Sequence, residues 1–132
     1  MGGTYGGNPV AVAAALSVLD VIEEEKLCAR ADRLGAIMVE RLKEMRQKNS
    51  LRPIGDVRGL GAMVAFELVK ERGTHEPDPD AIKPVVAAAL DAGLILLSCG
   101  YYANTIRILA PLTIDEGHLE EGLTMLEKAL LA

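Results

Sequence analysis

Arg107 is the residue whose type and setting most clearly suggest chemistry, because it stands inside the apolar segment "TIRIL". A guanidinium on an apolar strand cannot easily reach water, and burying it without a partner is costly. Its planar fork matches a carboxylate or a phosphate. The sequence therefore predicts either an anion-binding arginine or, since most charged side chains are solvated, an arginine on the wet face of an edge strand.

The opening segment "GGTYGGNP" has the composition of a phosphate-binding loop. Its backbone N–H groups and the Thr4 hydroxyl could hold a phosphate, and the N-terminus of the helix that follows would favour an anion. Such loops usually follow a strand, and no strand precedes this one. The segment is therefore either a flexible terminus or a loop whose scaffold lies outside this sequence.

The other candidate residues do not add up to a catalytic centre. Arg58, in "GDVRGLG", is interpreted as a turn residue paired with Asp56. No lysine stands where burial would desolvate it, and neither the cysteines nor the histidines have the spacing of a metal site or a reactive thiol. These residues are Lys26, Lys43, Lys48, Lys70, Lys83, Lys128, Cys28, Cys99, His75 and His118. The sequence predicts parts of a binding site without a general base, a nucleophile or a metal cluster.

Two helices are expected to follow the opening loop. Asn8 and Pro9 are typical of a helix start, and that helix is apolar on nearly every face, which predicts burial on several sides. A second, amphipathic helix is expected over about 27–48. The segment 49–61 is rich in glycine and proline and is interpreted as a break between elements.

The rest of the chain predicts short strands alternating with helices. Strands are expected at 62–69, 94–98 and 105–112. One helix is expected to be capped by Asp80 and to end at Gly93, and a last helix is expected to begin with a capping box at Thr113. The last helix carries an apolar stripe of Leu119, Leu123, Leu126 and Leu130. The order α-α-β-α-β-β-α predicts an α/β (α+β) fold in which a small sheet is covered by helices.

Composition narrows the class of protein. The 132 residues suit one domain, and half of them are apolar with one Phe and no Trp, so the core must be aliphatic. A net charge of −5 argues against a nucleic-acid surface. No apolar run is long enough for a membrane span, the first residues lack the pattern of a secretory signal, and the two cysteines lie far apart, which favours a reduced cytoplasmic protein.

Several segments together resemble the C-terminal third of the class III aminotransferases, which depend on pyridoxal phosphate, and among them 4-aminobutyrate aminotransferases. The segments are "GGTYGGNPVAVAAALSVLDVIEEE", "RADRLG", "IGDVRGLGAMVAFELV", "GLILLSCGYYANTIRILAPLTI" and the closing helix, in that order. The resemblance implies the small C-terminal domain of a fold type I enzyme, with a short, mostly antiparallel sheet. It also implies a dimer whose active sites lie at the subunit interface.

The resemblance gives two residues a role. Thr4 would hydrogen-bond the phosphate of pyridoxal 5'-phosphate bound in the neighbouring subunit. Arg107 would bind the α-carboxylate of glutamate or 2-oxoglutarate. When 4-aminobutyrate occupies the site, Arg107 would instead pair with a glutamate of the large domain. The expected reaction transfers an amino group from 4-aminobutyrate, or a related ω-amine, to 2-oxoglutarate.

The resemblance also implies that the Schiff-base lysine lies upstream of this sequence, so the chain by itself is expected to be inactive and not to bind the cofactor covalently. Residues 1–26 would pack on the missing large domain, and 27–132 would form the small domain. The alternatives are a non-catalytic, self-associating module and a truncated remnant with no activity of its own.

Overall fold

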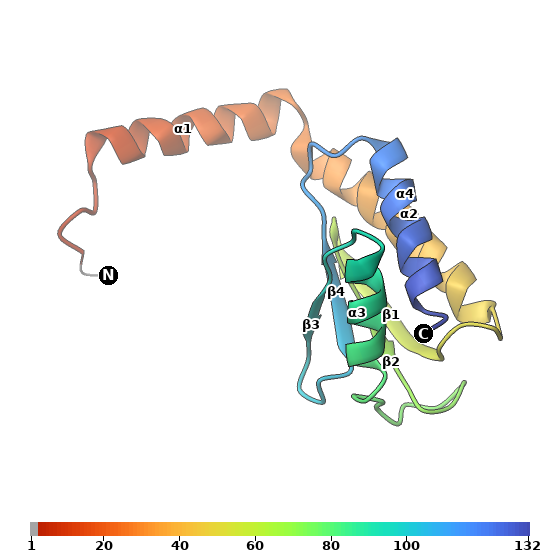
Figure 1. Ribbon diagram of the computed structural model, residues 1–132. Coiled ribbons are helices and arrows are strands. Elements are labelled where there is room, and N and C mark those ends of the chain that lie inside the picture. The colour runs from red at the N-terminus through yellow and green to blue at the C-terminus, as the bar shows by residue number, and fades with distance from the viewer. Residues whose placement is uncertain (1–2) are drawn as a thin grey trace.

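The computed structural model describes residues 3–132 and contains a four-stranded sheet with helices on one face (Figure 1). The strand order is β1-β2-β4-β3, and every neighbouring pair is antiparallel. This confirms the predicted α/β class with a short antiparallel sheet. The elements in chain order are α1 (Pro9–Glu24), α2 (Leu27–Gln47), β1 (Ile54–Leu60), β2 (Met63–Leu68), α3 (Ile82–Asp91), β3 (Leu97–Cys99), β4 (Thr105–Leu109) and α4 (Glu116–Ala129).

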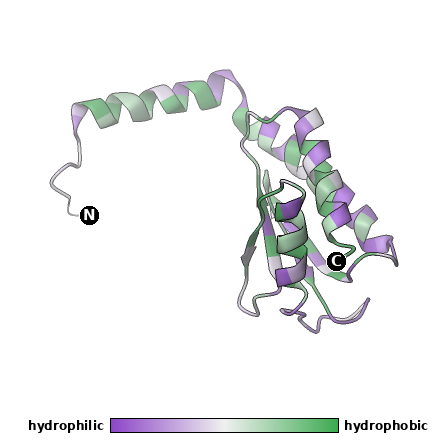
Figure 2. Ribbon diagram, in the orientation of Figure 1, coloured by the Kyte–Doolittle hydropathy of each residue, from purple (hydrophilic) through white to green (hydrophobic). Residues whose placement is uncertain are grey.

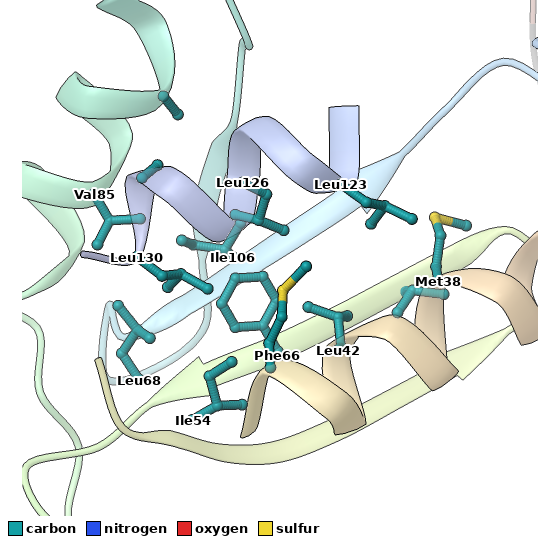
Figure 3. Packing of buried hydrophobic residues seen from close by; sticks show 14 of the residues in the cluster. Met38, Leu42, Ile54, Phe66, Leu68, Val85, Ile106, Leu123, Leu126 and Leu130 are labelled. Carbon is teal, nitrogen blue, oxygen red and sulfur yellow. The ribbon is translucent and has the colours of Figure 1, made fainter. Parts of the chain in front are cut away.

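The core lies between the sheet and the helices α2, α3 and α4. Along β2, the side chains of Val64, Phe66 and Leu68 are buried and those of the intervening residues are not, as the period-2 pattern predicts. Figure 3 shows the Phe66 ring between Leu42 of α2 and Ile106 of β4. The predicted leucine stripe of α4 is buried against the same core. The opposite face of the sheet carries no helix.

Helix α2 approaches the sheet closely at Gly35. A Cβ atom at this position would collide with the carbonyl oxygen of Gly61, which occupies the turn between β1 and β2 with a φ of +53°. Glycine is needed at Gly35 because any side chain would push the helix off the hairpin, and at Gly61 because the backbone is left-handed. This contact fixes α2 over β1 and β2.

Strand β1 is the element that the sequence interpretation missed. The segment 49–61 was expected to break the chain, yet seven of its residues form a strand paired with β2. The two glycines inside this strand, Gly55 and Gly59, do not mark turns. A Cβ at Gly55 would lie 2.7 Å from Cγ1 of Val69, and one at Gly59 would lie 2.9 Å from Cγ2 of Val64. They allow close approach within the sheet, so the interpretation as a break was wrong.

Two predicted helix caps also differ from the structure. The backbone N–H of Ala81 donates to Oδ1 of Asp78, so Asp80 is not the cap of α3. Helix α4 begins after Asp115, whose side chain accepts from the N–H of His118, so the predicted capping box at Thr113 lies too early. In both cases more than one Asp or Thr stands near the helix start, and the sequence does not rank them.

Helix α1 projects away from the rest of the chain (Figure 1). It begins as predicted, with Asn8 accepting hydrogen bonds from the N–H groups of Val10 and Ala11. None of its residues is buried, although Figure 2 shows that much of the helix is hydrophobic. Helix α1 is therefore not buried within residues 3–132, and the expectation that residues 1–26 pack on a large domain stays a prediction. Within residues 3–132, no helix is both long and apolar enough to cross a bilayer.

The cap of α4 predicts a pH dependence. Hydrogen bonds from the backbone and side chain of His118 lower the pKa of Asp115, and the hydrogen bond with Asp115 raises the pKa of His118 above 6.5. This pairing stabilises the fold while Asp115 is ionised and His118 is protonated. Its effect is lost as the pH rises through the raised pKa of His118 and, at the acid end, as the pH falls through the lowered pKa of Asp115. In Asp115→Asn, which keeps a good cap, an NMR titration should show the pKa of His118 falling towards its ordinary value. An unchanged titration curve would contradict the pairing.

Candidate substrate-binding face of the sheet

Arg107 lies on the face of the sheet that no helix covers. It stands in β4, directly opposite Ala65 of β2 on one side and Leu97 of β3 on the other. Both alternatives drawn from the sequence need correction. The strand is internal rather than an edge strand, and the Arg107 side chain is exposed rather than cut off from water. The alternation is as predicted, with Ile106 and Ile108 turned towards the core.

The surroundings of Arg107 on this open face are mostly aliphatic. Leu97, Leu109 and Met63 are about half exposed, at 54%, 60% and 49%. Ala65, the residue next to Arg107 across β2, is small and leaves space above the sheet. An exposed guanidinium in this setting can form charge-assisted hydrogen bonds with an anion.

A second arginine on the same face is already paired. Nη1 of Arg58 donates to Oδ2 of Asp56 and to Oε1 of Glu67, both at 2.7 Å. The hydrogen bond with Asp56, followed by the one with Glu67, raises the pKa of Arg58 above its ordinary value. The predicted pairing with Asp56 is confirmed, although Arg58 lies in a strand and not in a turn. This arginine is held in the sheet by two carboxylates and has little capacity left for a ligand.

Arg107, in contrast, makes no ion pair with any residue among 3–132. Glu67, which the sequence did not single out, lies on β2. Glu67 lies on the same face of the sheet as Arg58 and Arg107. The sequence could not show this, because it depends on the pairing of β1 with β2. The open face thus combines a neutralised Arg58 with an Arg107 whose charge is available.

A cavity of about 350 Å³ lies on the helix-covered side of the sheet, between α4 and the segments that lead into β3 and out of β4. Its lining is aliphatic apart from Arg107 and His118. Such a lining offers packing surface rather than hydrogen bonds. Because α4 packs on the other face of the sheet, this cavity is separate from the open face that carries the Arg107 side chain.

Thr4 lies in the loop at the free end of α1, well away from the sheet (Figure 1). The loop is exposed and turns tightly, with the N–H of Gly6 bonded to the carbonyl of Gly3 at 3.0 Å. The first N–H groups of α1 already donate to Asn8, so the helix N-terminus itself is not free for an anion. The Thr4 hydroxyl is exposed and can donate a hydrogen bond to a phosphate oxygen. The N-terminus of α1, which was expected to stabilise the same anion, is capped by Asn8 instead. The structure does not bring Thr4 and Arg107 together.

The lysines of the described chain are all on the surface. The six are Lys26, Lys43, Lys48, Lys70, Lys83 and Lys128, and each is exposed. A lysine that carries a cofactor or attacks a carbonyl needs a desolvated amine. None of the lysines within residues 3–132 has that setting.

The fold is that of the small C-terminal domain of a fold type I, pyridoxal-phosphate-dependent transferase, as its similarity to solved transaminase structures shows. The sequence matches the family "Aminotransferase class-III" over residues 1–130. The chain belongs to the class III aminotransferases, whose members use pyridoxal phosphate. This confirms the resemblance found in the sequence.

Two curated relatives and one solved structure illustrate the similarity. The chain is 51% identical to 5-aminovalerate aminotransferase DavT of Pseudomonas putida over 128 residues, which is 97% of this chain and 29% of that protein. It is 47% identical to 4-aminobutyrate aminotransferase GabT of Escherichia coli, covering 97% of this chain and 30% of that protein. A pyridoxal-phosphate-bound amine transaminase from an uncultivated Pseudomonas species superimposes with a TM-score of 0.83 at 36% identity, over 98% of this chain and 29% of that one. The chain thus spans less than a third of the length of these relatives.

Proposed function

We propose that this chain forms the C-terminal part of an aminotransferase that moves an amino group from 4-aminobutyrate, or a related ω-amine, to 2-oxoglutarate. The observation that carries the proposal is the unpaired, exposed Arg107 on the open face of a class III small domain. Relatives named for 4-aminobutyrate and for 5-aminovalerate support an ω-amino acid as the donor. Both donors are a chain of methylenes between an amine and a carboxylate.

Arg107 is the proposed substrate-binding residue. Its guanidinium can form two parallel hydrogen bonds with one carboxylate, which fixes the orientation of 2-oxoglutarate or glutamate as well as its position. The aliphatic neighbours Leu97 and Leu109 would lie beside the methylenes of the substrate. Once the rest of the enzyme covers this face and excludes water, the ion pair becomes much stronger than it would be on an open surface.

Pyridoxal 5'-phosphate is the proposed cofactor, and Thr4 is the residue of this chain that would hold its phosphate. When bound, the cofactor supplies the electron sink that allows an amino group to be exchanged between donor and acceptor. The Thr4 hydroxyl would donate a hydrogen bond to a phosphate oxygen. Because the loop of Thr4 lies far from Arg107 in one chain, the two residues would serve different active sites of a dimer.

Helix α1 provides a second argument that this chain works as part of a larger enzyme. Its side chains include Val10, Leu16, Val18 and Leu19, which are 57–79% exposed. Apolar surface of this extent is rarely left in water. Residues 1–26 would pack on a large domain of the kind that the relatives contain, and 27–132 would form the small domain. We call this assembly, the present chain joined to the upstream part that carries the cofactor lysine, the complete enzyme.

The proposal is tested by assaying the complete enzyme with 4-aminobutyrate and 5-aminovalerate as donors and 2-oxoglutarate as acceptor. Transamination of at least one donor is expected, and pyruvate should be a poorer acceptor because it lacks the second carboxylate. Residues 1–132 alone, mixed with pyridoxal phosphate, should give no turnover. Turnover by the isolated chain, or no reaction of the complete enzyme with either donor, would contradict the proposal.

The alternative of a non-catalytic, self-associating module has one supporting observation, which is again the exposed apolar surface of α1. Light scattering on residues 1–132 distinguishes this module from a part of a larger enzyme. A self-associating module would form a defined oligomer, and this oligomer would not dissociate when the upstream part of the enzyme is added.

The role of Thr4 predicts weaker cofactor binding when its hydroxyl is removed. In the complete enzyme, Thr4→Val keeps the shape of the side chain and removes the donor. Loss of a hydrogen bond to a charged group costs about 1.5–3 kcal/mol, so the dissociation constant for pyridoxal phosphate should rise by about 10- to 150-fold. Thr4→Ser, which keeps the hydroxyl, is the matched control. Equilibrium dialysis measures both, and equal affinities in the two variants would remove Thr4 from the phosphate site.

A further inference from the structure

Glu67 is placed between the two arginines of the open face. Ala65 lies directly opposite Arg58 of β1 and directly opposite Arg107 of β4. Glu67 follows Ala65 by two residues on β2, so its side chain is on the same face and is a diagonal neighbour of both arginines. Diagonal neighbours in a sheet are about 7–8 Å apart between Cα atoms, within reach of long side chains.

Only one of the two possible pairs is formed. Glu67 accepts a hydrogen bond from Nη1 of Arg58 at 2.7 Å, and Asp56 accepts one from the same nitrogen at 2.7 Å. No ion pair joins Glu67 to Arg107 in the described chain. Glu67 is also the more protected of the two carboxylates, since its side chain is 27% exposed and that of Asp56 is 50% exposed.

This arrangement has two consequences for an anion at Arg107. A Glu67 that turned to Arg107 would occupy the fork that a substrate carboxylate needs. A Glu67 left without a cation would repel that carboxylate, because like charges placed close together are unfavourable. Arg58 prevents both, since it binds the Glu67 carboxylate and neutralises it.

We propose that Arg58, held by Asp56, is a positioning residue that keeps Glu67 away from Arg107 and so sets the affinity of the enzyme for dicarboxylate acceptors. The inference rests on the proposed role of Arg107 and adds a residue that does not itself touch the substrate. Asp56 contributes by anchoring the Arg58 guanidinium over β1. The specificity of the site is thus determined partly by an ion pair beside it.

The test compares three variants of the complete enzyme. Arg58→Gln releases Glu67 and should raise both the KM for 2-oxoglutarate and the dissociation constant for glutarate about tenfold or more, with a smaller effect on kcat. Arg58→Gln combined with Glu67→Gln removes the competitor together with its partner and should return both constants to within about twofold of the starting enzyme. Glu67→Gln alone should leave glutarate binding unchanged or tighter.

The outcomes separate this inference from the proposed function. If Arg58→Gln weakens glutarate binding and the double variant does not restore it, Arg58 acts through the fold and the inference is wrong. If Glu67→Gln alone weakens binding, Glu67 is itself needed for the ligand and the inference is also wrong, even where Arg58→Gln fails to fold. If Arg107→Ala leaves glutarate binding unchanged, the proposed role of Arg107 fails. If Arg107→Ala weakens binding and Arg58→Gln does not, only this inference fails.

Discussion

Arg107→Ala in the complete enzyme is expected to lower kcat/KM for 2-oxoglutarate by about 30- to 5000-fold, equivalent to about 2–5 kcal/mol. On its proposed role, losing the guanidinium would leave the substrate carboxylate without its partner once the rest of the enzyme covers this face. The same change should have a much smaller effect on folding, because the side chain is exposed and makes no ion pair within residues 3–132. Steady-state kinetics with varied 2-oxoglutarate measures the effect.

Arg107→Lys is the matched control for this prediction. Lysine keeps the positive charge and loses the planar fork. The kcat/KM of this variant for 2-oxoglutarate should therefore lie between those of the starting enzyme and of Arg107→Ala. A similar loss in both variants would mean that the geometry of the two hydrogen bonds dominates. Unchanged kinetics in Arg107→Ala would remove the residue from the site.

Phe66→Ala should give the largest loss of stability among single substitutions in the small domain, about 3–5 kcal/mol. Phe66 has no exposed surface, and its ring fills the space between α2 and β4 (Figure 3). It is the one phenylalanine of the sequence, in a core that is otherwise aliphatic, so no neighbour can refill the volume. Hydrogen exchange of the β2 amides in the complete enzyme measures the free energy of opening this domain.

Met63→Ala is the control for Phe66→Ala because Met63 lies on the same strand and faces the open side of the sheet, where it is 49% exposed. Truncating a half-exposed side chain away from the core should change stability by about 0.5 kcal/mol or less. Equal losses in the two variants would contradict the assignment of the core to the helix-covered face.

The family resemblance and most of the helices could be predicted from the sequence because both are local properties. Asn8 and Pro9 start α1 through contacts within one turn, and the leucines of α4 repeat at helical spacing. The strand β2 was recognisable because its apolar and polar residues alternate. None of these features depends on which segments meet in space.

Strand β1 could not be predicted in this way because its glycines have a tertiary cause. Gly55 and Gly59 are needed where Val69 and Val64 approach the strand, and without knowledge of those neighbours the residues resemble a turn. Missing β1 also hid the candidate site. Arg58 was assigned to a turn, so its place on the same sheet face as Glu67 and Arg107 was not visible.

The sequence by itself determined the class III family, the helical and strand periodicities, and the choice of Thr4 and Arg107 as candidates, because motifs and spacing are written in the order of residues. Only the tertiary structure decided which arginine is free. Arg58 and Arg107 are chemically the same and both stand in short strands. The strand order places Glu67 within reach of both, and Asp56 adds a second carboxylate on the side of Arg58. The physical reason is that an ion pair depends on the distance between charged side chains on neighbouring strands. That distance is set by the strand pairing and cannot be read from the order of residues.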